Sequence, residues 1–222
     1  GGRDDLQGKS WRVEQARLAD LRVPPTLTGV LQARLDSLPM EQRSILQQAA
    51  VVGRTFWDLV VARIGQSTGE GVGDEEIPAV LSALRGREMV DHKETSAFAG
   101  AQEFVFRHAA LREVAYESIL KKVRKGYHAL VADWLMEQSG ERTSEYTGLI
   151  AEHLEKAGRT DEALVYLWQA GDQAAAQYAN GEAVRFIGRA LDLLQAVEQP
   201  PAEAQKQEYM LLLGREGAYK LL

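Results

Sequence analysis

Two segments that begin twenty residues apart share one pattern, and this internal repeat constrains the fold more than any other feature of the sequence. Residues 160–167 and 180–187 each open with a residue type that caps helices and place an alanine three positions later. In each copy an aromatic residue lies three positions after that alanine, at Tyr166 and Phe186. A second alanine lies seven positions after the first, at Ala170 and Ala190. Alanines let helices approach closely and aromatic side chains fill the grooves, so the repeat predicts stacked helical hairpins in an open-ended solenoid.

The chain from Leu111 onward has the pattern of helices throughout. We expect breaks at residues 125–126, 139–140, 158–160 and 179–181. Residues 218–222 end in the middle of the pattern, so we expect the array to continue.

A basic cluster, Lys121-Lys122-Val123-Arg124-Lys125, precedes the first of these breaks. At the end of a helix its charges would complement the negative end of the helix dipole. The alternative interpretation is a contact with an anion or a partner.

Helical patterns also fill the first part of the chain. Thr26 is expected to cap the first helix, while Pro39 opens the second and Gly53 ends it. Positions that recur every three or four residues should face the core, and in these two helices they are Leu27, Val30, Leu31, Leu35, Leu38, Ile45, Leu46, Ala49, Ala50 and Val52.

Residues 55–58 resemble a capping box that opens a third helix, which runs through Ile64. The glycine-rich residues 65–73 are expected to form a loop. Three acidic residues within residues 74–78 favour the start of a fourth helix, where the dipole is positive. Its apolar stripe is Ile77, Val80, Leu81 and Leu84.

Two short apolar runs, Met89-Val90 and Phe104-Val105-Phe106, lie on either side of a polar, glycine-containing stretch. This arrangement predicts two antiparallel strands joined by a mobile loop. Three helices followed by a β-hairpin form a winged helix. The expected fold is therefore mainly α, with a winged-helix domain before the solenoid.

Arg107 and His108 follow the second of these strands and directly precede an amphipathic helix. A strand-to-helix junction can expose a charged side chain to a ligand while both flanking elements stay packed. For His108 one interpretation is a packed or capping histidine at the start of the helix. The other is that the Arg107-His108 pair senses a ligand.

Composition excludes several classes of function. A net charge of -6 disfavours generic binding of polyanions, and the lack of cysteine excludes disulfides and thiolate metal sites. No apolar run approaches 18 residues, and the first residues lack the apolar core of a signal peptide, so we expect a cytoplasmic protein. Residues 11–13 read as one short strand whose partner would precede Gly1, so we expect a fragment of a longer chain.

The sequence offers no positive sign of catalysis or of a cofactor site. It contains no P-loop motif, and residues 69–73 lack the preceding strand of a nucleotide-binding loop. His92, His108, His128 and His153 fall on different expected elements without the spacing of metal ligands. We therefore expect no enzyme, no metal and no cofactor in this fragment.

Four separated blocks of the sequence, residues 23–39, 49–56, 106–108 and 151–158, resemble bacterial signal-transduction ATPases of the STAND class. The resemblance is to the region after the ATPase core in regulators that carry a nucleotide cyclase domain or a LuxR-type DNA-binding domain. It implies that residues 1–23 end the ATPase region, 24–110 form the winged helix, 111–142 are connecting helices, and 143–222 begin tetratricopeptide-like repeats.

The resemblance also implies a role for the junction. In such switches the winged helix folds back on ADP, and a histidine at its end contacts the nucleotide phosphate. His108 is the positional candidate, with Arg107 beside it, although the triplet is Arg107-His108-Ala109 rather than Met-His-Asp. ATP or ADP with Mg would bind the upstream core, outside this chain.

The expected function is thus a non-catalytic regulatory segment that relays nucleotide state and inducer binding to an output domain, a cyclase or a transcription regulator. Its partners would be the ATPase core, the output domain and a protein or small-molecule inducer at the repeats. The alternative is a DNA-binding winged helix. Its recognition helix would span residues 74–87, which begin with acidic residues and carry Arg85 and Arg87 only at the far end.

Overall fold

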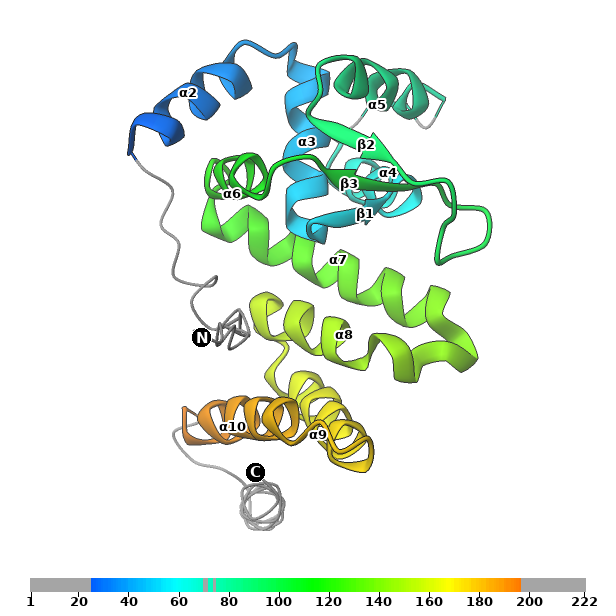
Figure 1. Ribbon diagram of the computed structural model, residues 1–222, viewed down its shortest axis with the longest axis vertical. Coiled ribbons are helices and arrows are strands. Elements are labelled where there is room, and N and C mark those ends of the chain that lie inside the picture. The colour runs from blue at the N-terminus through cyan, green and yellow to red at the C-terminus, as the bar shows by residue number, and fades with distance from the viewer. Residues whose placement is uncertain (1–24, 70–71, 74, 197–222) are drawn as a thin grey trace, which may run out of the picture.

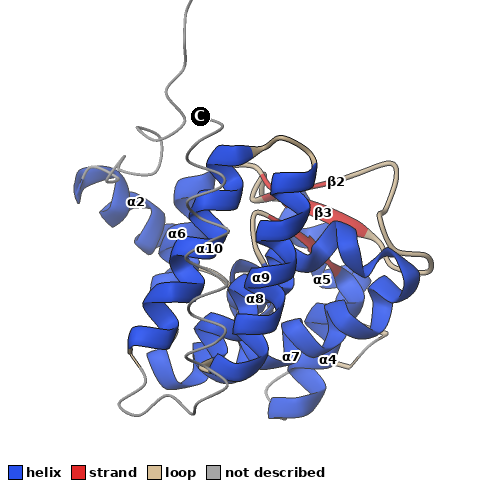
Figure 2. Ribbon diagram, turned by 90° about the horizontal axis from the view of Figure 1, so that it is seen from below, coloured by secondary structure: helices blue, strands red, loops and turns tan. Residues whose placement is uncertain are grey.

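The computed structural model describes residues 25–69, 72–73 and 75–196 (Figure 1). Helices make up most of these residues, and three short strands lie to one side of the molecule (Figure 2). The elements are α2 (Pro25–Asp36), α3 (Met40–Val52), β1 (Thr55–Trp57), α4 (Asp58–Thr68), α5 (Ile77–Gly86), β2 (Val90–His92), β3 (Glu103–Phe106), α6 (Ala109–Glu117), α7 (Lys121–Ser139), η1 (Gly140–Arg142), α8 (Thr143–Ala157), α9 (Thr160–Ala176) and α10 (Asn180–Gln195). The expectation of a mainly α protein is confirmed. The strand expected at residues 11–13 and the pattern at 218–222 lie outside the described residues.

Helix α2 differs from the expectation at its first turns. It begins at Pro25, so Thr26 lies inside the helix and does not cap it. Leu31 and Leu35 are buried, but Leu27 is 44% exposed and Val30 is 58% exposed. Figure 1 shows the reason, because the first half of α2 extends away from α3 and α6.

The central helix α3 forms as its sequence predicts. Pro39 precedes it and Gly53 follows it, with the Gly53 N–H donating to the Ala49 carbonyl. The five positions expected to face the core are all buried. Gly53 has a φ of 153°, a conformation that favours glycine, and a Cβ there would lie 3.3 Å from the Thr55 carbonyl oxygen.

The sheet contains one strand more than the sequence predicted. Residues 55–57 form β1, which pairs antiparallel with β3 in the order β1-β3-β2, so the capping-box interpretation of Thr55 is wrong. Phe56 lies opposite Phe104, and their rings stack at 5.7 Å, so burial of aromatic surface overrides the local helix signal. Asp58 is the first residue of α4, and its Oδ1 accepts hydrogen bonds from the N–H groups of Leu59 and Gln102.

The loop expected at residues 65–73 is shorter than predicted. Helix α4 continues to Thr68, and Gly69 ends it with a left-handed φ of 67°. Helix α5 then begins at Ile77, and Ile77, Leu81 and Leu84 are buried as expected. Strands β2 and β3 pair antiparallel, which confirms the predicted hairpin.

Helix α7 runs unbroken from Lys121 to Ser139, so the break expected at residues 125–126 is absent. The chain turns earlier instead, at residues 118–120, between α6 and α7. The basic residues 121–125 therefore form the first turn of α7, at the positive end of its dipole. The interpretation that they complement a helix C-terminus is wrong.

The two copies of the sequence repeat fall at the starts of helices α9 and α10. Gly140 and Gly158 end α7 and α8, and residues 177–179 separate α9 from α10. Residues 161–167 and 181–187 have the same sequence of exposed and buried positions, and Ala163 and Ala183 are both fully buried. The Phe186 ring packs so closely on Gly148 that a Cβ there would lie 2.8 Å from it.

One hydrophobic core crosses most of the molecule. We call α2 to α6 with the three strands the N-terminal body, and α7 to α10 the helical array. The largest cluster of buried residues extends from Leu31 in the body to Ala163 in the array and includes Val131, Leu135 and Leu154. Helix α7 lies along the lower side of the body (Figure 1). The body and the first helices of the array therefore share a core.

Candidate functional site

Arg107 lies where β3 ends, and the hairpin already holds its guanidinium. Its Nε and Nη2 donate to the two carboxylate oxygens of Asp91 at 3.2 and 3.0 Å, and Nη1 lies 3.2 Å from Glu88. The main-chain N–H of Arg107 also donates to the Met89 carbonyl at 3.1 Å. Arg107 is thus oriented by two carboxylates, and an anion that binds it must compete with them.

His108 sits directly before α6 with an exposed side chain. Its main-chain carbonyl accepts hydrogen bonds from the N–H groups of Leu111 and Arg112. The side chain makes no capping hydrogen bond, so the interpretation of His108 as a packed or capping histidine is wrong for its ring. The ring is open to a ligand.

Charges of both signs gather around this junction. The pKa of Asp91 is lowered, mainly by its hydrogen bonds to Arg107, with smaller effects of Arg85 and His108. The pKa of Arg107 is raised by Asp91 and Glu88. We call these five residues the junction site.

Glu88 takes part in this site from an unfavourable backbone position. Its φ of 58° is left-handed, at the end of α5, where glycine is the usual residue. The Met89 N–H closes the turn by donating to the Leu84 carbonyl. Backbone strain at a residue whose carboxylate contacts an oriented arginine is the kind of feature that functional sites retain.

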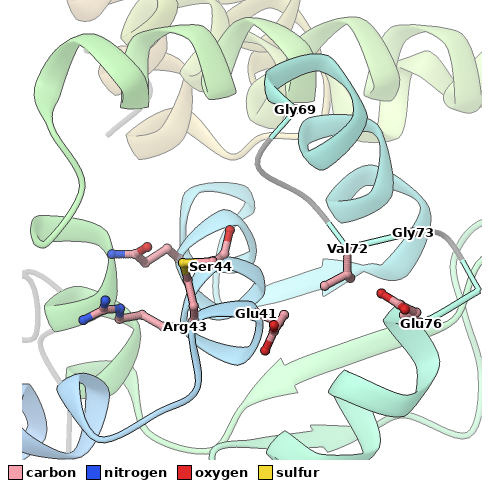
Figure 3. A pocket seen from close by; sticks show the side chains of 9 residues that line it. Glu41, Arg43, Ser44, Gly69, Val72, Gly73 and Glu76 are labelled. Carbon is pink, nitrogen blue, oxygen red and sulfur yellow. The ribbon is translucent and has the colours of Figure 1, made fainter.

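A separate pocket of about 650 Å³ lies between the start of α3 and the connection from α4 to α5 (Figure 3). Figure 3 shows Glu41 and Glu76 beside Val72, while Arg43 points to the other side. The Arg43 guanidinium contacts Asp36 at 3.4 Å. With two carboxylates and its arginine engaged elsewhere, this pocket does not suit a phosphate group.

Sequence reasoning missed a buried pair of histidines. His128 of α7 and His153 of α8 lie with their Nδ1 atoms 2.9 Å apart, although 25 positions separate them in the sequence. The Tyr116 hydroxyl of α6 lies 2.9 Å from His128 Nε2. We call Tyr116, His128 and His153 the histidine joint. The position of His153 within the apolar stripe of Ile150, Leu154 and Ala157 signals its burial but not its partner.

Burial keeps both histidines of this joint neutral. The exposed fraction is 1% for His128 and 3% for His153. Burial lowers the pKa of His128 to about 2 and that of His153 to about 4. Arg112, Arg124 and Lys156 lie 4.6–5.9 Å from the centre of the Tyr116 ring, and these cations further disfavour protonation.

A second contact joins the body to the array by aromatic packing. Trp57 of β1 stacks on Trp134 of α7 at 5.5 Å, and Phe98 packs edge-on against both rings at 4.9 Å. Tyr146 of α8 lies 4.8 Å from Phe98. We call these four residues the aromatic joint. The Trp57 Nε1 donates to the buried carboxylate of Glu103 at 3.1 Å, so the polar atom of that ring is also satisfied.

No group of three or more His, Cys, Asp or Glu side chains in residues 25–69, 72–73 and 75–196 is placed to hold a metal ion. Within the same residues, no helix has both the length and the apolar character needed to cross a membrane.

Comparison with known proteins gives one curated relative, "Uncharacterized protein R02095" of Rhizobium meliloti (strain 1021). It is 34% identical to this chain over 116 residues. The match covers 52% of this chain but only 11% of the relative, so the chain spans a small part of the relative's length. No family model matches the chain, and no solved structure matches it with significance.

Proposed function

We propose that this chain is a non-catalytic relay segment of a nucleotide-switched signal-transduction ATPase of the STAND class. The observation that carries the proposal is the junction site, where an open His108 and an oriented Arg107 lie on a body that shares its core with the helical array. A ligand at the junction and a partner on the array would therefore act on one packed unit.

The fold supports this assignment in outline. Residues 24–110 would be a winged helix, because three helices, α3 to α5, precede the hairpin of β2 and β3, while β1 adds a third strand. Residues 111–142 would be connecting helices. Residues 143–222 would begin tetratricopeptide-like repeats, in keeping with the paired helices and the repeated burial of Ala163 and Ala183. Residues 1–23 would end the ATPase region.

The mechanism places nucleotide between this body and an upstream ATPase core that holds ATP or ADP with Mg. The phosphate of ADP would contact His108 and compete with Asp91 and Glu88 for Arg107. Exchange for ATP would remove that contact and free the core to rotate against the body. An inducer bound to the array would favour the open state, and the signal would pass to a cyclase or transcription-regulator domain of the same cytoplasmic protein.

ADP binding by the intact protein tests this proposal. We expect His108→Ala to weaken ADP binding at least tenfold and to raise the basal output. The matched control is His92→Ala, because His92 is exposed and neighbours Asp91 in β2 but points to the opposite face of the strand. If His108→Ala leaves both ADP affinity and basal output unchanged, the nucleotide-sensing role is wrong.

A measurement of DNA binding separates this proposal from the alternative of a DNA-binding winged helix. Helix α5 follows Glu75 and Glu76, and its basic residue Arg85 lies close enough to Asp91 to influence that carboxylate. These charges disfavour a recognition helix. Salt-dependent binding of the 222-residue chain to duplex DNA, with no effect of His108→Ala on nucleotide, would support the alternative instead.

A further inference from the structure

The basic residues at the start of α7 belong to a larger positive surface that three helices build together. Arg112 of α6, Arg124 of α7 and Lys156 of α8 place their charged groups 5.1, 4.6 and 5.9 Å from the centre of the Tyr116 ring. Figure 1 shows the turn from α6 into α7 at the edge of the molecule, above one end of α8. The positive charge therefore comes from tertiary packing as well as from the local run of lysines.

The three cations around Tyr116 already have partners within the molecule. Arg124 contacts Glu117 at 2.9 Å, and Lys156 contacts Glu152 at 2.6 Å. The Nε of Arg112 donates to the main-chain carbonyl of Ala50 at 2.8 Å. These inner cations are thus held in place by the fold.

The lysines at the start of α7 differ from these inner cations. Lys121, Lys122 and Lys125 are exposed, and none of them forms an ion pair with another described residue. The first turn of α7 holds no acidic residue, and its cap, Leu120, makes no side-chain hydrogen bond. The positive end of the helix dipole adds to the potential at these lysines. Because the whole chain has a net charge of -6, this end of α7 is a local exception.

Two apolar side chains alternate with these lysines. Leu120 is 75% exposed and Val123 is 36% exposed. The Val123 N–H donates to the Leu120 carbonyl at 2.9 Å, so both residues belong to one turn. We call Leu120, Lys121, Lys122, Val123 and Lys125 the lysine corner. Apolar side chains edged by charged ones are the arrangement of a surface that contacts a protein partner.

We propose that the lysine corner binds a short acidic segment of a partner protein, whose carboxylates meet the lysines and whose apolar side chain packs on Leu120 and Val123. Charge complementarity selects this occupant. A bilayer or a DNA duplex presents an extended negative surface, so it would also face the rest of this acidic chain. A short segment meets the corner alone. The inference goes beyond the proposed function, since it involves no nucleotide.

The position of the lysine corner connects such a partner to the interface between the body and the array. Tyr116, whose ring lies beside Arg124, contacts His128 through its hydroxyl at 2.9 Å. Lys125 lies against the end of α8, because a Cβ on Gly158 would be 2.8 Å from the Lys125 Nζ. A segment bound at the corner would therefore lie where α6, α7 and α8 meet.

Fluorescence anisotropy of the 222-residue chain with a labelled peptide tests the corner. The probe is a twelve-residue peptide that repeats Glu-Glu-Leu, and in its counterpart Gln replaces Glu. We expect micromolar binding of the acidic peptide at low salt and at least tenfold weaker binding of the Gln peptide. Lys121→Gln combined with Lys122→Gln should weaken the acidic peptide at least tenfold, and Leu120→Ser several-fold. The charge-matched control, Arg54→Gln combined with Arg87→Gln, removes two exposed cations of the body and should have less than a twofold effect.

Three results would overturn the inference. The first is no binding of the acidic peptide at low salt, or equal weakening by the control pair. The second is binding of phosphatidylserine vesicles or duplex DNA that the lysine variant abolishes and the peptide does not displace. The third is a lower unfolding temperature of the lysine variant, which would assign Lys121 and Lys122 to the fold. We expect an equal or higher temperature, because the variant removes positive charge from the positive end of α7.

Discussion

The aromatic joint and the histidine joint connect the same two parts of the molecule by different physics. Trp57, Phe98, Trp134 and Tyr146 are held by buried ring surface, which depends little on pH and on the exact position of any one atom. The histidine joint depends on two directional contacts of 2.9 Å, in each of which one atom must donate and the other accept. The aromatic joint contributes most to the free energy of unfolding. The histidine joint fixes the relative position of the helices that it connects and is sensitive to a single proton.

The largest expected effect is loss of the Trp134 ring of the aromatic joint. Trp134→Ala removes a side chain that is 3% exposed and contacts two other rings, so the free energy of unfolding should fall by about 3–5 kcal/mol in urea titrations. Trp168→Ala is the matched control, because Trp168 is 36% exposed on α9 and should cost much less. Equal costs for the two substitutions would contradict the role of the aromatic joint.

Acid should weaken the histidine joint by a comparable amount. Both folded-state pKa values lie below the ordinary 6.5, so the unfolded chain binds more protons and stability falls as pH drops below 6.5. At pH 5, 1.5 units below 6.5, each histidine costs about 2 kcal/mol, from 1.36 kcal/mol per unit. Urea titrations at pH 7.5 and 5 measure the sum, and the combined variant His128→Gln with His153→Gln should show a much flatter pH dependence. A steep dependence in that variant would assign the effect to other groups.

A smaller loss is expected when only the Tyr116 hydroxyl of the histidine joint is removed. Tyr116→Phe keeps the ring and leaves His128 Nε2 without its hydrogen bond, which should cost about 1–2 kcal/mol in the free energy of unfolding. Tyr178→Phe provides the control, because Tyr178 is 84% exposed. If the two phenylalanine variants are equally stable, the Tyr116 hydroxyl does not contribute to the joint.

The smallest effect on stability is expected at the junction site, which lies on the surface. Asp91→Asn removes the charge that holds Arg107 but buries no new group, so thermal unfolding should hardly change. In the intact protein the freed Arg107 should bind ADP several-fold more tightly. The control is Glu94→Gln, an exposed carboxylate of the neighbouring loop. Weaker ADP binding by Asp91→Asn would contradict the competition between carboxylate and phosphate.

Much of the helical framework could be predicted because local signals and packing agree there. The stripes of α3 and α5, the hairpin of β2 and β3, and the repeat in α9 and α10 all follow from sequence periods. The prediction for residues 55–57 was wrong because their local capping pattern competes with pairing to β3, some fifty positions away. The buried contact of Phe56 with Phe104 favours the strand over the helix cap. Gly126 suggested a break, but a helix as well packed as α7 tolerates one glycine.

The candidate sites were predictable only in part. Arg107 and His108 occur at a strand-to-helix junction as expected, because both flanking elements have clear local patterns. The roles of Asp91 and Glu88 depend on hairpin register and on the left-handed turn after α5, which no local signal gives. The pairing of His128 with His153 depends on how α7 packs on α8, so sequence spacing alone could not reveal it.

The central claim is that the body and the array act as one unit, and a distance measurement tests it most directly. These 222 residues contain no cysteine, so Glu94→Cys in the body and Gln177→Cys in the array would carry the only spin labels within them, with any cysteine elsewhere in the intact protein replaced by serine. In the intact protein at pH 7.5 we predict a single narrow distance that is the same with ADP and with ATP, while the distance from the body to the ATPase core changes. A distance between the two labels that shifts or broadens when ATP replaces ADP would contradict the account.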